Sequence, residues 1–155
     1  MADDFKTQFV TAADKPALIA FSTPAWLSAV KVALKELGYK VHTAATHSDF
    51  LVRFHQVGYQ VIVIEEMFCA NNLDENSTLK TLQNMPMSLR REATVILLGD
   101  SFSTFAPMEA FKHSVHAVIN SSEMFMLNQL IEKAVAENTL FLRSYREVQS
   151  RVAHL

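Results

Sequence analysis

The sequence predicts an α/β protein, a three-layer, doubly wound, five-stranded parallel sheet with an extended C-terminal helix. Five short apolar runs alternate with segments whose apolar residues recur at helical spacing. This alternation is typical of parallel strands joined by right-handed helical crossovers. Half of the 155 residues are apolar, which suffices for one domain with a buried core. We therefore expect one folded domain without an internal linker.

The five apolar runs are expected to be the strands. The first is continuously apolar, as in a parallel strand that is covered on both faces. The third consists only of β-branched residues and gives the strongest strand prediction, whereas the second is weaker. The five runs are residues 17–21, 40–44, 61–64, 94–98 and 116–119.

Helical spacing and capping residues predict five helices between and after these strands. Thr23 is suited to the N-cap of the first helix, with Pro24 at its first helical position. Thr46 or Ser48 can cap the second, and Pro86 ends or interrupts the third. The helical segments are expected at about residues 24–37, 48–57, 77–85, 108–115 and 123–155.

Composition excludes several classes of function. The net charge of −2 gives no basic field for general nucleic-acid binding, so no direct nucleic-acid partner is expected. A single cysteine, Cys69, excludes an internal disulfide and a CxxC zinc site. Three glycines cannot build a P-loop or a dinucleotide-binding turn, and His113 with His116 is far from a zinc motif. We expect no metal and no cofactor.

The N-terminus lacks a basic region followed by an apolar run, and no apolar stretch approaches the ~18 residues of a membrane span. A cytoplasmic protein without a membrane partner is therefore expected.

One segment resembles a known family. Residues 24–41, in particular Glu36-Leu37-Gly38-Tyr39 leading into the second strand, are similar to the first helix and second strand of receiver domains. These are the flavodoxin-like domains of bacterial two-component response regulators. The resemblance extends over about residues 15–138. It implies an N-terminal arm at residues 1–15, a receiver-like domain at 16–138 and a C-terminal helix extension at 139–155.

The functional positions of that family are all changed here. The resemblance places the Mg²⁺-binding acidic pair at Phe21 and Ser22, and the phosphoacceptor aspartate at Glu65. It places the hydroxyl residue after the fourth strand at Gly99 and the lysine after the fifth at Asn120. Phosphoryl transfer depends on positioning and charge stabilisation. We therefore expect a pseudo-receiver that accepts no phosphoryl group, has no catalytic residues, is not an enzyme, and acts in signal transduction by binding proteins.

Two alternatives concern the ends of the strands. The fixed charge of Glu65 could imitate a phosphorylated state, but we prefer its interpretation as a solvated carboxylate beside Glu66. The alternative function is a small flavodoxin-like enzyme or ligand-binding protein. It would use the cleft near Glu65, Glu66 and Asp100.

The last helix carries apolar residues in alternating steps of four and three, the spacing of a coiled coil. Its first members, up to Ala134, are expected to cover the domain's own core. The later ones predict a homodimer interface, with a polar residue that fixes the register. The alternative is a helix that folds back over its own domain or the N-terminal arm. The expected interface residues are Asn138, Phe141, Tyr145, Val148 and Val152.

Overall fold

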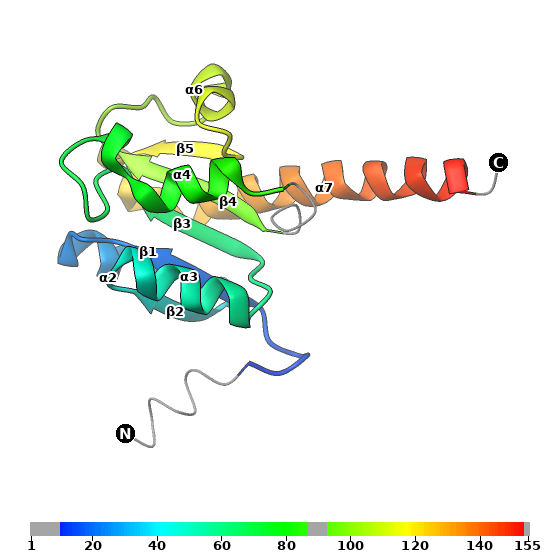
Figure 1. Cartoon of the computed structure of the whole chain (residues 1–155), viewed down its shortest axis with the longest axis horizontal. Helices are drawn as coiled ribbons and strands as arrows, with labels where there is room; N and C mark the ends of the chain where they lie inside the picture. The colour runs from blue at the N-terminus through cyan, green and yellow to red at the C-terminus, as the bar shows by residue number, and fades with distance from the viewer. Residues whose placement is uncertain (1–9, 87–92, 154–155) are drawn as a thin grey trace.

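The computed structural model describes residues 10–86 and 93–153, and it contains a five-stranded, all-parallel sheet between two layers of helices (Figure 1). The strand order is β2-β1-β3-β4-β5, the flavodoxin-like order. The predicted fold class is thus confirmed. The strands are β1 (Pro16–Ala20), β2 (Lys40–Ala44), β3 (Val61–Glu65), β4 (Thr94–Gly99) and β5 (Ala117–Asn120).

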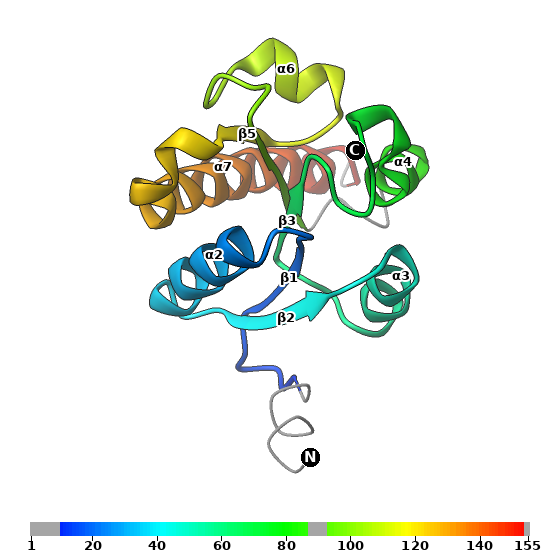
Figure 2. The ribbon, with the colours of Figure 1, turned by 90° about the vertical axis from the view of Figure 1, so that its left-hand side faces the viewer.

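Helices cover both faces of the sheet (Figure 2). One face is covered by α2 (Pro24–Glu36) and α7 (Leu127–Ala153). The other is covered by α3 (His47–Gln56), α4 (Ser77–Asn84) and α6 (Pro107–Lys112). Two short 3₁₀ helices, η1 (Leu73–Glu75) and η2 (Ser121–Met126), precede α4 and α7. In the described part of the chain, no helix combines the length and apolarity that a bilayer crossing requires.

The two faces of the sheet form two separate cores. Since successive strand residues point to opposite faces, Val61 and Val63 of β3 pack toward α2 and α7. Their neighbours Ile62 and Ile64 pack toward α3 and α4. All four are fully buried, as expected for a central parallel strand.

The capping residues of two helices can be compared with the expectation. Thr46 rather than Ser48 caps α3, because its hydroxyl accepts the Asp49 amide at 3.1 Å. Thr23 occupies the N-cap position of α2, but its side chain makes no capping bond. After α2, Gly38 has a φ of +88°, a conformation that glycine adopts without steric cost.

Two later helices are shorter than predicted. The helix expected at residues 108–115 ends at Lys112, because Ser114 adopts a φ of +55° and turns the chain. The last helix was expected from Glu123, but Glu123 itself is not helical and η2 precedes α7.

We predict that Ile62→Ala or Ile96→Ala lowers the free energy of unfolding by about 2–5 kcal/mol, through lost burial and a residual cavity. Both side chains are fully buried, one in each core. Urea denaturation followed by circular dichroism measures the loss. Val52→Ala on the exposed side of α3 is the control and should change stability by less than about 0.5 kcal/mol. A loss below about 1 kcal/mol at both isoleucines would contradict the assignment of the cores.

Candidate functional site

The carboxyl ends of the parallel strands meet at one edge of the sheet, where open α/β folds place their ligands. Ser22 follows β1, Glu65 ends β3, and Gly99 ends β4. Asn120 ends β5 and pairs with Gly99 in the β4–β5 register. The sheet thus brings four of the five positions of the expected degenerate site to the same edge. The fifth, Phe21, also follows β1, but its side chain is buried in the core beneath α2 and α7.

Glu65 is buried and its carboxylate is fully engaged. Only 2% of the residue is exposed. Its Oε2 accepts the backbone amides of Ser22 at 2.6 Å and Thr23 at 3.2 Å, and its Oε1 accepts the Thr23 hydroxyl. These donors stand at the start of α2, where the helix dipole also favours a negative charge.

The preferred interpretation of Glu65 as a solvated carboxylate is therefore wrong. Glutamate is one methylene longer than aspartate, and its carboxylate lies against the turn after β1 rather than in solvent. Thr23 makes no capping bond, and its hydroxyl donates to Glu65 instead.

Glu66 is also buried, and it explains the glycine at position 99. A Cβ placed on Gly99 would lie 2.6 Å from the Cβ of Glu66 and closer still to its Oε2. Glu66 Oε2 accepts the Ser101 amide at 3.4 Å, so the side chain lies across the end of β4. A hydroxyl-bearing residue at position 99 would have to displace Glu66.

The loop after β3 is fixed by Asn76, which the sequence interpretation missed. Asn76 is fully buried, and its side-chain amide donates to the carbonyls of Glu65 at 3.0 Å and Glu66 at 3.1 Å. Its Oδ1 accepts the Leu79 amide and caps α4. An asparagine directly before a helical segment was the available signal, because asparagine is a preferred N-cap. The loop is also tied to the turn after β1, since the Cys69 amide donates to Ser22 Oγ at 2.9 Å.

Asn120 fixes the loop after β4. Its side-chain amide donates to the carbonyls of Phe102 at 2.6 Å and Asp100 at 3.3 Å. Its backbone amide donates to the Thr104 hydroxyl at 2.9 Å. The Ser121 hydroxyl donates to the Asp100 carboxylate. Asp100 is thereby directed toward β5, and no described contact joins it to Glu65 or Glu66.

These residues do not fit a magnesium ion. Mg²⁺ requires several oxygen ligands in near-octahedral geometry. Phe21 has none, the Ser22 hydroxyl is engaged with the Cys69 amide, and both oxygens of Glu65 already accept hydrogen bonds. Across residues 10–86 and 93–153, no three His, Cys, Asp or Glu side chains converge as they would around a metal.

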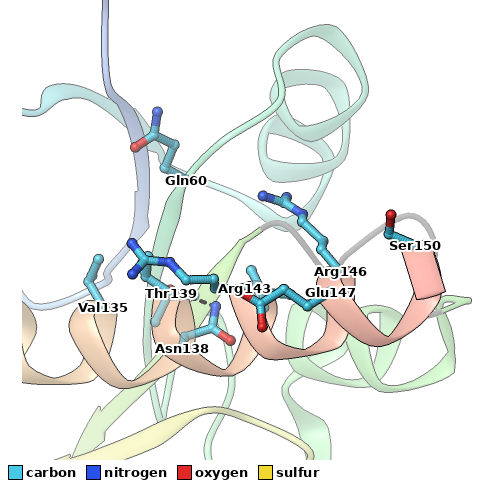
Figure 3. Close-up of a pocket in the computed structure, with 10 residues that line it drawn as sticks. Gln60, Val135, Asn138, Thr139, Arg143, Arg146, Glu147 and Ser150 are labelled. Atoms are coloured by element: carbon cyan, nitrogen blue, oxygen red, sulfur yellow. Dashed lines mark hydrogen bonds between the residues drawn. The ribbon is translucent and has the colours of Figure 1, made fainter.

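At the opposite edge of the sheet, Asn138 on α7 is buried rather than exposed. Its side-chain amide donates to Thr94 Oγ1, at the start of β4, over 2.9 Å (Figure 3). The prediction that Asn138 belongs to an exposed interface is therefore wrong, because β4 begins directly beneath it. Asn138 and Thr94 border a hollow of about 580 Å³ that is also lined by Gln60 and by Arg143 of α7.

Beyond Asn138, α7 continues as one helix to Ala153 and projects past the sheet (Figure 1). Within the described residues, Leu142 is the last buried member of the helix. Phe141, Val148 and Val152 are 64%, 58% and 62% exposed. Tyr145 is half-buried and accepts a hydrogen bond from Gln149. The alternative of a helix that folds back over its own domain is not observed. The part of the expected N-terminal arm before Val10 lies outside the described residues.

No protein-family model matches the sequence. No curated protein matches it either. Solved structures, by contrast, match it over most of its length.

Three structures illustrate the match. CheY4, a chemotaxis response regulator of Vibrio cholerae, has a TM-score of 0.63 at 15% identity over 79% of this chain and 99% of its own. A CheY-like response regulator receiver domain protein of Methanospirillum hungatei has a TM-score of 0.63 at 20% identity over 82% and 98%. NtrX of Brucella abortus, solved with ADP, has a TM-score of 0.67 at 15% identity over 90% of this chain and 30% of its own. The chain therefore has the fold of response-regulator receiver domains.

We predict that Gly99→Ala lowers the free energy of unfolding by about 1–3 kcal/mol, because the added methyl group overpacks against Glu66. Gly58→Ala is the matched control. Nothing lies within 4 Å of a Cβ at that position, so the change should be neutral or slightly stabilising. Chemical denaturation measures the free energy of unfolding of both variants and of the wild type. Equal stability of Gly99→Ala and the wild type would show that Glu66 does not fill the space above β4.

Proposed function

We propose that this protein is a receiver-like signalling domain that does not accept a phosphoryl group and acts by binding other proteins. The observation that carries the proposal is the buried carboxylate of Glu65, whose oxygens accept three hydrogen bonds from Ser22 and Thr23. A phosphoacceptor must present a carboxylate oxygen to the donor and share a metal ion with it. Glu65 presents its carboxylate to its own chain instead.

The fixed loops support a static binding domain over a switch. A switching element needs two arrangements of similar free energy. Here Asn76 anchors the loop after β3 through two backbone carbonyls, and Asn120 anchors the loop after β4 through two others. Breaking the Asn76 bonds would leave buried polar groups unpaired.

The alternative of an enzyme or ligand-binding protein that uses Glu65, Glu66 and Asp100 has less support. Both glutamates are buried and engaged, and Asp100 is bonded to Ser121. No geometry among them leaves an acid and a base facing a common space.

The proposal includes a homodimer formed through the exposed stripe of α7. Phe141, Val148 and Val152 lie on the helix beyond the sheet, and their spacing with Tyr145 is that of a coiled-coil seam. An apolar stripe that continues past the domain it covers is typical of an interface. The same stripe on a second copy offers a matching surface, and a cytoplasmic setting is expected for such a signalling protein.

Incubation with Mg²⁺ and acetyl phosphate should leave the intact mass of the protein unchanged, because Glu65 has no free carboxylate oxygen and Asn120 supplies no charge. Mass spectrometry under non-acidic conditions measures the result. A phosphorylation-competent receiver domain in the same buffer is the positive control. One added phosphoryl group per chain, removed by hydroxylamine as an acyl phosphate would be, would refute phosphorylation incompetence.

Sedimentation velocity should find a dimer for the wild type and a monomer for Tyr145→Glu combined with Val148→Glu, because these changes place unpaired charges in the seam. Circular dichroism should be nearly unchanged. Thr139→Glu combined with Ser150→Glu adds the same charge outside the stripe and should leave the dimer intact. A wild type that is monomeric at high micromolar concentration would contradict the dimer.

A further inference from the structure

The strand β2 forms an edge of the sheet. In the described residues it pairs only with β1, in parallel. The Lys40 amide donates to the carbonyl of Lys15 at 2.8 Å, so the backbone groups of Lys40, His42 and Ala44 face β1. By the alternation of a parallel ladder, the N–H and C=O groups of Val41 and Thr43 point outward. These are the groups that an added strand would pair with.

This edge lies in a groove whose walls are basic. The groove has a volume of about 520 Å³ and runs along β2 between α2 and α3, the helices on the two faces of the sheet (Figure 2). Its lining includes Lys31 and Lys35 of α2, Lys40 of β2 and Arg53 of α3. Among the lining residues, Asp14 alone is acidic, and it is paired with Lys40 at 3.6 Å.

We propose that the β2 edge binds an extended acidic segment of another protein, which pairs with Val41 and Thr43 as an additional parallel or antiparallel strand. Strand addition supplies backbone hydrogen bonds, and the flanking side chains supply specificity. Successive side chains of an added strand point to opposite faces of the sheet. Every second residue of the bound segment would thus face α2, where an acidic side chain would meet Lys31 and Lys35. The residues between them would face α3, where an acidic side chain would meet Arg53.

The features of the groove favour an acidic protein segment over a second copy of this chain and over nucleic acid. A second copy that paired edge to edge would bring two identical sets of cations together, which is repulsive. A lysine on an edge strand commonly protects against aggregation, and Lys40 alone would fit that role. Protection against aggregation does not explain why basic side chains of α2 and α3, on the two faces of the sheet, also line the groove at this strand. Nucleic acid would use the charges but not the outward N–H and C=O groups of Val41 and Thr43.

This surface is distinct from both the strand-end site and the exposed stripe of α7. It involves neither Glu65 nor any residue of α7. The inference therefore stands whether or not the protein dimerises or accepts a phosphoryl group.

The test is fluorescence anisotropy with a labelled peptide that alternates glutamate and threonine, added to the full chain. We expect saturable binding that weakens as salt is raised. Lys31→Glu combined with Lys35→Glu should weaken binding about tenfold or more, since it reverses the charge of one wall. Lys80→Glu combined with Lys112→Glu, on α4 and α6, changes the net charge equally and should leave binding unchanged. Circular dichroism checks that both variants fold.

A second peptide separates strand pairing from charge attraction alone. It has the same sequence, with its alternate backbone nitrogens methylated so that they cannot donate to β2. We expect its binding to be lost while its charge is kept. Equal binding of the methylated peptide would overturn the proposal, as would equal binding of a single-stranded oligonucleotide. Absence of binding by the unmodified peptide, or equal weakening in the two charge-reversed variants, would overturn it too.

Discussion

The hydrogen bonds between the Glu65 carboxylate and the start of α2 determine how this domain is built around its strand ends. A buried carboxylate is strongly unfavourable unless it is hydrogen-bonded, and here three donors from the turn after β1 meet it. The contact joins the ends of β1 and β3, which are neighbours in the sheet. It also engages the hydroxyl of Thr23, which makes no capping bond to α2. At the carboxyl ends of β1 and β3, this carboxylate is thereby bonded to the chain itself.

The other residues at this edge are physically consistent with that contact. Glu66 turns across the end of β4, and only a glycine at position 99 leaves room for it. Asn120 donates to two loop carbonyls, a role that depends on its amide and not on a positive charge. Asn76 holds the carbonyls of both glutamates and so fixes the backbone from which their side chains extend. Glu66, Asn76 and Asn120 each make an internal contact, so the edge is a packed and bonded part of the structure.

The two surfaces that we propose for recognition lie away from the strand ends. The exposed stripe lies on the part of α7 that projects beyond the sheet (Figure 1). The basic groove follows the edge strand β2. One surface is apolar and helical, and the other is charged and offers backbone groups. Their different chemistry matches the two different partners that we propose, a second copy at α7 and an acidic segment at β2.

The sequence by itself determined the order and type of the strands and helices, because apolar periodicity and capping residues act locally. It also predicted residues at or just after the ends of strands, and the structure has Phe21, Ser22, Glu65, Gly99 and Asn120 there. The burial of Glu65 was decided by tertiary structure, because its partner Ser22 lies 43 residues away in the sequence. Tertiary structure also explains the glycine at position 99, because the side chain of Glu66 fills the space that a Cβ there would need. Asn138 is the clearest case. The spacing of the residues on α7 is the same for a helix that covers a sheet and for a helix that pairs with another helix, so it could not tell which of the two surrounds Asn138. Only the position of Thr94 beneath α7 decides that Asn138 faces inward, whereas Phe141, one turn further on, is left exposed.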